Sequence, residues 1–416
     1  MPFELFIGLR YLKAKRKSTF ISLITLISVA GVALGVMALI VVLAVMTGFE
    51  EDLKDKILGT NAHIVVLSGS GAMQGYQDTM KRLQGMDGVV AATPFIYNQV
   101  MLSSGRSVSG VVLRGIDVVS DAKVTNLHKS MVEGSLVQLE QRSLKNPGVV
   151  IGKELARNLG LILGDSVDVI SPMGNITPFG MMPKLRHFQV VGIFNTGMFE
   201  YDSTLAYVSL AEAQQFLGLG DTVTGIQLKV KDVYHTGAMV QTIGKELGPL
   251  YNVRDWMQMN KNILFALKTE KSVMFIILTL IVLVAAFGIA STLFMVVMEK
   301  TRDIAILKSM GATSRSIMRI FVFEGVIIGV FGTVIGVLSG LLVALNLEPI
   351  VSVVQKVTGF ELFSKDIYYL DHFPSLVIPS DVILISVTAV LISFVATLYP
   401  SWAASRLAPA EALRYE

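Results

Sequence analysis

Four long apolar runs alternate with polar stretches along the chain. They cover residues 20–46, 273–298, 321–347 and 382–399. Each is close to the roughly 20 residues that a helix needs to cross a bilayer. None contains Lys, Arg or Asp, whose burial near the bilayer centre costs several kcal/mol. The pattern predicts four transmembrane helices, with Glu324 in the first turn of the third.

The charges between the apolar runs predict an orientation in the membrane. Basic residues crowd the N-terminal segment and the 299–319 loop, whereas the 348–381 loop is acidic. By the positive-inside rule, both termini and the 299–319 loop are expected in the cytoplasm. The acidic loop and the long 48–271 segment would then lie outside.

The 48–271 segment is long enough to be a domain of its own. Short β-like runs flank a helical stretch at 63–94, and a similar unit recurs at 226–253. Further strands at 108–115, 149–151, 166–171 and 188–193 and a helix at 153–159 are expected between them, and an amphipathic helix at 256–271 after them. We therefore predict a membrane α-helical protein with a large, two-part α+β extracytoplasmic (periplasmic) domain inserted between transmembrane helices 1 and 2.

These patterns predict the following division of the chain. The expected segments are a cytoplasmic amphipathic N-terminus (1–19), the first span (20–47), the periplasmic domain (48–271), the second span (272–298), a cytoplasmic loop (299–316), the third span (317–347), a periplasmic loop (348–381), the fourth span (382–399) and a cytoplasmic tail (400–416).

Composition removes several classes of function. The chain has 416 residues, 52% of them hydrophobic, and a net charge of +3, which gives no sign of nucleic-acid binding. It contains no cysteine, so disulfides and cysteine-ligated metals are excluded. Its histidines lack metal-ligand spacing, and no phosphate-binding loop motif is present. We expect no catalytic residue, no metal and no bound cofactor, so that any work must be driven by a partner.

The polar loop between the second and third apolar runs carries an amphipathic pattern. Apolar residues in EKTRDIAILKSMGA alternate with charges of both signs, and Gly311 ends the run. A short helix of this kind is suited to dock on a soluble partner. An ordinary polar loop at the lipid headgroups is the alternative.

Two further patterns indicate close contacts. Small-residue spacing predicts helix packing along one face of the first and third spans, at Gly31, Gly35, Gly325, Gly329, Gly332, Gly336 and Gly340, with a subunit interface or a hinge as alternatives. The stretch SPMGNITPFGMMPKLRH is rich in proline and glycine, which predicts an irregular loop rather than a regular hairpin. Its methionines and phenylalanine favour a protruding docking loop; a loop folded back on its own domain is the alternative.

At this level the chain resembles the MacB/FtsX-type permeases of ABC transporters. It is most similar to the permeases of the lipoprotein-releasing (Lol) system, the LolC/LolE family. The resemblance covers nearly the whole chain. It rests on FIGLRYLKAKRKSTFISLITLISVAGVALGV, NAHIVV, TGMFEYDSTLAYV, EKTRDIAILKSMGA, SKDIYYLDHFP and YPSWAASRLAPAEALRYE.

The resemblance implies a permease dimer with two cytosolic LolD-like ATPase subunits, which bind the ATP and Mg. A coupling helix would contact the ATPase through Ile306, Leu307, Met310, Gly311 and Ala312. The substrate would be an acylated lipoprotein of the inner membrane, handed to a periplasmic LolA-like chaperone. The chaperone hook would comprise Pro172, Thr177, Pro178, Phe179, Gly180, Met181, Pro183 and Arg186.

Some alternatives stay open at this point. The hook core resembles LolC, whereas Asp366-Ile367-Tyr368 resembles LolE, so either a homodimer or a heterodimer is compatible with the sequence. A MacB-like export permease with a periplasmic adaptor is disfavoured because no nucleotide-binding domain is fused to the chain. An FtsX-like regulator of a cell-wall hydrolase is disfavoured by the length of the outer segment.

Overall fold

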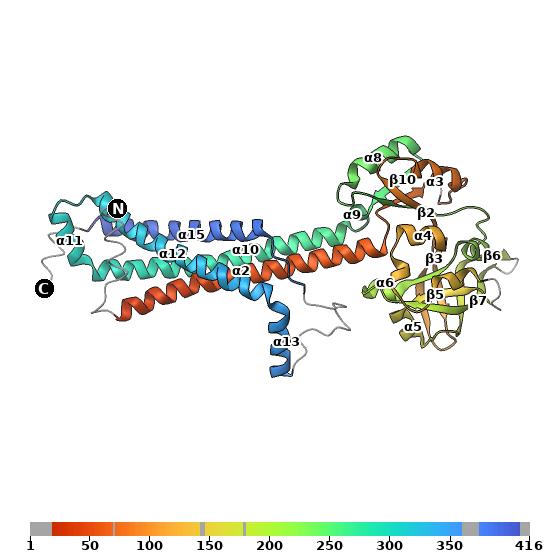
Figure 1. Cartoon of the computed structure of the whole chain (residues 1–416), viewed down its shortest axis with the longest axis horizontal. Helices are drawn as coiled ribbons and strands as arrows, with labels where there is room; N and C mark the ends of the chain where they lie inside the picture. Colours follow the sequence, from red (N-terminus) through yellow and green to blue (C-terminus); the bar gives the residue numbers. More distant parts are fainter. Residues whose placement is uncertain (1–18, 70, 142–145, 178–179, 360–373, 408–416) are drawn as a thin grey trace. The chain divides into compact units, whose positions relative to one another are not determined.

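The computed structural model describes most of the chain as two compact units. Among the described residues, unit 1 comprises those within 19–51, 265–359 and 374–407, and unit 2 comprises those within 52–264. Figure 1 labels the helices and strands. The described residues are 19–69, 71–141, 146–177, 180–359 and 374–407. The basic N-terminal segment, Asp366–Tyr368 and the end of the C-terminal tail therefore lie outside them.

Four helices are long and apolar enough to cross a membrane: α2 (Thr19–Thr60), α10 (Lys261–Glu299), α12 (Ser314–Leu345) and α15 (Pro379–Ser405). Two shorter helices, α11 (Thr301–Ser309) and α13 (Leu347–Thr358), follow α10 and α12. Because α12 begins at Ser314, Glu324 lies about three turns inside it and is buried, rather than in its first turn.

The four long helices share one apolar core in unit 1. Val36, Val282, Ile328 and Ala389 come from α2, α10, α12 and α15 respectively, and all are buried in it. Ser28 of α2 lies 2.6 Å from the hydroxyl of Thr292 on α10, within hydrogen-bond distance. Figure 1 shows these helices running alongside one another.

Unit 2 is built on one mixed sheet. Its strands are β1 (Ile64–Ser68), β2 (Val89–Ser103), β3 (Val108–Ile116), β4 (Met131–Gly134), β5 (Gly148–Gly152), β6 (Ser166–Thr177), β7 (Gly180–Phe194), β8 (Leu205–Ser209), β9 (Gly225–Val230) and β10 (Tyr251–Asp255). Its helices are α3 (Tyr76–Gln84), α4 (Val118–Val124), α5 (Lys153–Leu159), α6 (Phe199–Thr204), α7 (Leu210–Leu217), α8 (Thr236–Leu247) and α9 (Trp256–Met259).

The strand order is β10-β1-β9-β2-β3-β8-β5-β7-β4, with β6 pairing to β2 and β7. The pairs β3–β8 and β5–β7 are parallel, and the others are antiparallel. The first half of β2 pairs with β9, and its second half pairs with β3 and β6. This long strand therefore joins the two parts expected from the sequence into one sheet.

The prediction of an irregular loop for SPMGNITPFGMMPKLRH is wrong, because this stretch forms a hairpin, although one with an interrupted register. Strands β6 and β7 pair antiparallel up to Thr177 and Gly180. The register shifts between the pairs Ser171–Lys184 and Asn175–Met182. Both Pro172 and Pro183 fall inside this shift, where the regular ladder is interrupted and a missing N–H does little harm.

Candidate functional site: helix α11, the β6–β7 ribbon and a cavity in unit 2

Helix α11 has an inner and an outer side. Ile304 and Ala305 are buried, and Leu307 packs against the same apolar cluster as Ile304. Ile306 and Met310 are 44% and 81% exposed. The motif therefore exposes two apolar side chains, while its buried apolar residues hold the helix against the rest of unit 1.

The inner side of α11 contacts three other helices. Its cluster takes residues from the end of α10, the start of α12 and the end of α15: Val296, Val297, Ile317, Ile320, Phe321 and Ala404. Lys308 adds a polar contact, because its Nζ donates to the carbonyls of Ser405 and Leu407 at 2.6 and 2.8 Å. Helix α11 is thus held by α10, α12 and α15 together.

The turn after α11 depends on Gly311. Its φ of +103° is a left-handed conformation that residues with a Cβ rarely adopt. Ala312 follows, donates its N–H to Leu307 and packs on the same cluster as Leu307. The Thr313 hydroxyl then caps α12 by accepting from the Ser316 N–H at 3.2 Å. Gly311 and Ala312 therefore set the angle between α11 and α12.

The glycines singled out in the sequence all lie against other helices of unit 1. A Cβ built on Gly325 or Gly329 would come within 3 Å of Thr397 or Ser393 on α15. One built on Gly332 or Gly336 would do the same against α2. Contacts are looser for Gly340 against Ile40, Gly35 against Val282 and Gly31 against Ala285, at 3.1, 3.2 and 3.7 Å.

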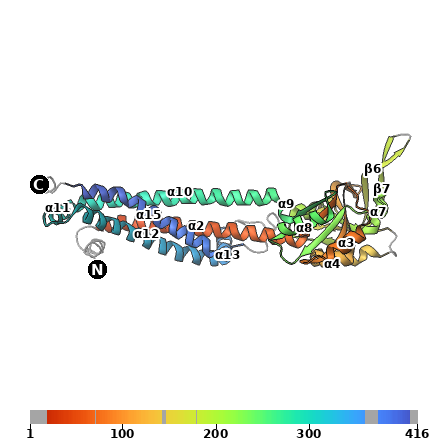
Figure 2. The same ribbon diagram turned by 90° about the horizontal axis from the view of Figure 1, so that it is seen from above.

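The outer half of the β6–β7 hairpin is a free-standing ribbon. Strand β2 pairs with β6 only at Asp168–Ile170, so residues 171–177 pair with β7 alone. Figure 2 shows this ribbon extending beyond the other strands of unit 2. Pro172 and Pro183 are exposed, and Thr177 and Gly180 are paired at its far end. Among the other predicted hook residues, Met181 pairs through its backbone with Ile176, and Pro178 and Phe179 lie outside the described residues.

Arg186 lies at the base of the ribbon, already engaged with unit 2. Its guanidinium forms an ion pair with Glu212 of α7 at 2.8 Å and donates to Gln215 at 3.2 Å. It also lies 5.8 Å from the centre of the Phe188 ring. On the neighbouring rung His187 contacts Asp168 across the two strands. These contacts fix the direction in which the ribbon leaves the sheet.

A cavity of about 640 Å³ lies on one face of the sheet in unit 2. Alternate residues of neighbouring strands form its floor, since side chains two apart share a face. The floor includes Val65 and Leu67 on β1, Phe95 and Tyr97 on β2, Val112 and Arg114 on β3, Leu205 on β8 and Gln227 on β9. Asn61, Tyr201, Thr204 and Met259 come from helix ends around it.

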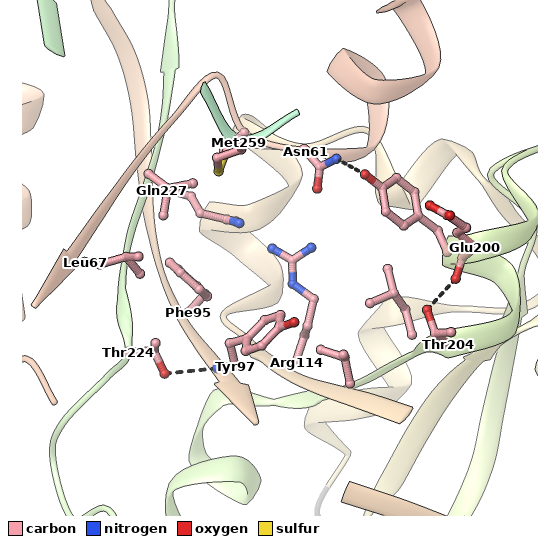
Figure 3. Close-up of a pocket in the computed structure, with 15 residues that line it drawn as sticks. Asn61, Leu67, Phe95, Tyr97, Arg114, Glu200, Thr204, Thr224, Gln227 and Met259 are labelled. Atoms are coloured by element: carbon pink, nitrogen blue, oxygen red, sulfur yellow. Dashed lines mark hydrogen bonds between the residues drawn. The ribbon is translucent and has the colours of Figure 1, made fainter. Parts of the chain in front are cut away.

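Of the polar side chains that line this cavity, those of Arg114 and Gln227 are buried. The Asn61 amide donates to the Tyr201 hydroxyl at 2.7 Å. Burial raises the pKa of Tyr201, so its hydroxyl stays neutral at physiological pH. Figure 3 shows the Arg114 guanidinium pointing into the middle of the cavity, on the side of Asn61 and Gln227.

The turn before Tyr201 is built around Asp202. Its carboxylate accepts from the N–H and the hydroxyl of Thr196 at 2.8 and 2.9 Å. Burial nevertheless raises the pKa of Asp202. A Cβ on Gly152 would lie 2.2 Å from the Asp202 carbonyl, so only glycine allows this approach. The TGMFEYDSTLAYV motif therefore positions Tyr201 at the cavity.

No cluster of three or more His, Asp or Glu residues suited to a metal ion occurs in the part of the chain that the structure describes.

Comparisons with known proteins place these features in a family. The MacB-like periplasmic core domain model matches residues 25–246, and the FtsX-like permease C-terminal model matches residues 275–409. The chain is 39% identical to the lipoprotein-releasing system transmembrane protein LolC of Neisseria meningitidis serogroup B, over 99% of both chains. The chain belongs to the LolC/LolE family.

Other relatives agree with this assignment. LolC of Xylella fastidiosa strain Temecula1 is 38% identical over 100% of this chain and 99% of its own. LolE of Haemophilus influenzae is 31% identical over 98% of both chains. As a LolC/LolE protein with four apolar helices, the chain is a multi-pass protein of the inner membrane.

Two solved structures also match. The extracellular domain of the transporter YknZ from Gram-positive bacteria has a TM-score of 0.33 and 13% identity, covering 46% of this chain and 99% of its own. The periplasmic region of MacB from Actinobacillus actinomycetemcomitans has a TM-score of 0.33 and 15% identity, covering 50% of this chain and 95% of its own.

Proposed function

We propose that this chain is the permease subunit of an ABC-type machine that extracts acylated lipoproteins from the outer leaflet of the inner membrane. The released lipoprotein passes to a periplasmic chaperone of the LolA kind. The observation that carries this proposal is the 39% identity to a lipoprotein-releasing system protein over 99% of both chains. Export with an adaptor, or regulation of a hydrolase, has no comparable support.

The proposed orientation places both termini and α11 in the cytoplasm and unit 2 in the periplasm. It rests on the basic residues of the 299–319 loop and the acidic residues of the 348–381 loop. The element order supports it, because unit 2 follows α2 and precedes α10.

A separate cytosolic ATPase supplies the energy, and ATP and Mg bind there. Exposed Ile306 and Met310 fit an apolar groove on that partner, as hot-spot residues at the centre of an interface commonly do. Leu307 and Ala312 act from inside, by holding α11 on the ends of α10, α12 and α15. The permease itself has no catalytic role in this scheme.

The need for such coupling follows from the substrate. Moving an acyl chain out of a bilayer costs about 0.8 kcal/mol per methylene group, so release is not spontaneous. ATPase closure pushes α11, and the glycine contacts of α12 with α2 and α15 pass that movement through the helices. A second permease copy, identical or of the LolE kind, completes the path.

The ribbon of β6 and β7 is the proposed chaperone hook. The outer half of β6 pairs with β7 and with no other strand, so the ribbon extends from the sheet. Arg186 anchors the base of the ribbon through its ion pair with Glu212 of α7. A ribbon that no third strand covers offers a partner backbone contacts, and its sequence contains Met173, Met181 and Met182.

The test is release of a triacylated lipoprotein from proteoliposomes containing this chain, the ATPase and the chaperone. Met310→Asp, alone and with Ile306→Asp, should abolish ATP-dependent release and ATPase co-purification. Val119→Asp, an exposed apolar position on α4, serves as the matched control and should change neither. Release that persists without ATPase, or wild-type co-purification of the double variant, would refute the proposal.

A further inference from the structure

The cavity of unit 2 has a composition that neither coupling nor chaperone binding explains. Its volume of about 640 Å³ lies within the roughly 300–1,000 Å³ of small-molecule sites. Its walls are mostly apolar, with Val65, Leu67, Phe95 and Leu205 among them. A cavity of this kind accepts a hydrocarbon chain.

One charged group lies inside these apolar walls. Arg114 is 7% exposed, and no carboxylate comes within ion-pair distance of it among the described residues. Its Nε has no hydrogen-bond partner in the described part of the chain. Burying a guanidinium without a counter-ion is unfavourable. The buried Arg114 guanidinium is therefore available to bind an anionic ligand.

The surroundings of Arg114 hold it without neutralising it. Its guanidinium lies 5.9 Å from the centre of the Phe95 ring and 5.7 Å from that of Tyr207, both within cation–π range. The buried Asp121 attracts it electrostatically, but the Asp121 carboxylate accepts its hydrogen bond from Thr125 at 2.7 Å. The exposed carboxylate of Glu200 lies at the edge of the cavity.

A second buried polar group lies close by. Gln227 is 3% exposed, and its Oε1 has no hydrogen-bond partner among the described residues. Figure 3 shows its amide turned toward the Arg114 guanidinium. The unpaired oxygen is an acceptor, so it is the amide N–H₂ group of Gln227 that can donate to an anion. Arg114 and Gln227 together form a polar end to an otherwise apolar cavity.

We propose that this cavity binds a single-chain anionic amphiphile, with its carboxylate or phosphate head accepting from the Arg114 guanidinium and the Gln227 amide N–H₂ group, and its hydrocarbon tail along Val65, Leu67 and Phe95. The planar guanidinium suits either head, because it can donate two parallel hydrogen bonds. Such a ligand can come from a free fatty acid or from a lysophospholipid. The site does not depend on the proposed ATPase coupling.

Two residues of the cavity wall are close in sequence to long helices of the chain. Asn61 directly follows α2, and Met259 ends α9 just before α10. A bound amphiphile therefore contacts the connections to both membrane helices within unit 2.

The test uses the full chain in nanodiscs of phosphatidylcholine, which supplies no anionic lipid. Palmitate and lysophosphatidylglycerol, each with a photoreactive group on the tail, are cross-linked, and the labelled peptides are mapped by mass spectrometry. We expect labels on the peptides containing Leu67, Phe95 and Thr204, and competition by the same unlabelled amphiphile. A hexadecanol probe of the same length has no negative charge, so it should bind about tenfold more weakly. This factor corresponds to the loss of one charge-assisted hydrogen bond.

Two kinds of variant test separately the positive charge of Arg114 and the volume of the cavity. Arg114→Met should lose at least tenfold in labelling, Arg114→Lys should retain part of it, and Arg82→Met, at an exposed arginine outside the cavity, should match wild type. Thr204→Trp fills the exposed edge of the cavity with Arg114 intact and should also block labelling, which keeps the test valid if Arg114→Met unfolds.

The two probes distinguish the sources, since labelling by either one supports the site and identifies its head group. Equal labelling by hexadecanol, unchanged labelling of Arg114→Met and Thr204→Trp, or labels confined to the membrane helices would overturn the proposal. Lipoprotein release can fail in the assay above while this binding persists, so the two proposals fail separately.

Discussion

Lys308 and Ser405 join two helix ends that are far apart in the sequence. The Nζ of Lys308, in the last turn of α11, donates to the Ser405 carbonyl at the end of α15 at 2.6 Å. A cation near the last carbonyls of a helix is favoured by the helix dipole and by the unsatisfied carbonyls there. The contact ties α11 to α15, the fourth long helix.

Removing the Lys308 ammonium should loosen this connection. Lys308→Met keeps most of the apolar stem and loses hydrogen bonds worth roughly 1.5–3 kcal/mol when one partner is charged. We expect a lower melting temperature in detergent and weaker stimulation of the ATPase by the permease. Lys308→Arg should retain most of both, and a Met variant as stable and as active as wild type would contradict the role.

The glycine contacts allow a test with an internal control. Gly329→Ala places a Cβ 2.5 Å from the Ser393 Cβ, whereas Gly31→Ala places one 3.7 Å from Ala285. Overpacking of this kind costs typically about 1–3 kcal/mol, so thermal unfolding in detergent should show a loss for the first variant only. If instead the oligomeric state changes while stability is kept, the α12 glycines belong to a subunit interface.

The ion pair of Arg186 with Glu212 predicts the result of a charge swap. Arg186→Glu should weaken chaperone capture, because two carboxylates then face each other at the base of the ribbon. The double variant Arg186→Glu with Glu212→Arg should restore capture if Arg186 acts by directing the ribbon. Pull-down with the purified chaperone measures this, and failure to restore would mean that Arg186 contacts the chaperone directly.

His63 makes the stability of unit 2 depend on pH. Burial lowers the pKa of His63 from its ordinary 6.5, and the nearby Lys229 adds to this against a hydrogen bond with Val230. The neutral ring can accept the Val230 N–H at 3.2 Å. The folded state therefore binds fewer protons than the unfolded state, so stability is full above pH 6.5 and falls as the pH drops below it.

Hydrogen exchange of the β1 and β9 amides in the full chain measures this effect. Protection should fall between pH 7.5 and pH 5.5 in the wild type and change less in His63→Gln, once intrinsic exchange rates are taken into account. An equal pH dependence in both proteins would assign the slope to another group.

The long helices could be predicted because their apolar runs are continuous and free of basic residues. Their ends could not, since α2 continues past the apolar run through the polar turns of Glu50 to Thr60. There Asp52 and Lys56 form an ion pair at 3.1 Å, and Ile57 is fully buried. Within α2 the pattern changes from uniformly apolar to amphipathic, and in a sequence such a change looks the same as the end of a helix.

The candidate sites show the same division. The amphipathic period indicated α11, but only three-dimensional packing separates inner Leu307 from exposed Ile306 and Met310. Pro172 and Pro183 argued against a hairpin because sequence alone does not show that both fall in one register shift. The sequence did not predict the cavity, although Arg114 follows the apolar run Val111–Leu113 and Gln227 lies between Ile226 and Leu228. That signal becomes specific only when neighbouring strands place both on one face.

The pairing of β1 with β10 has a mechanical consequence. The register joins Ile64 to Asp255, so the chain enters β1 from α2 and leaves β10 toward α10 at the same end of the ladder. A force that separates these two connections would unzip the ladder rung by rung instead of shearing all its rungs at once. The first rung is reinforced: Trp256 donates from its backbone to His63 at 2.9 Å and from its indole to Val233 at 2.8 Å. Trp256 therefore stabilises the end of the β1–β10 ladder that is connected to the membrane helices, where separation of the two strands would begin.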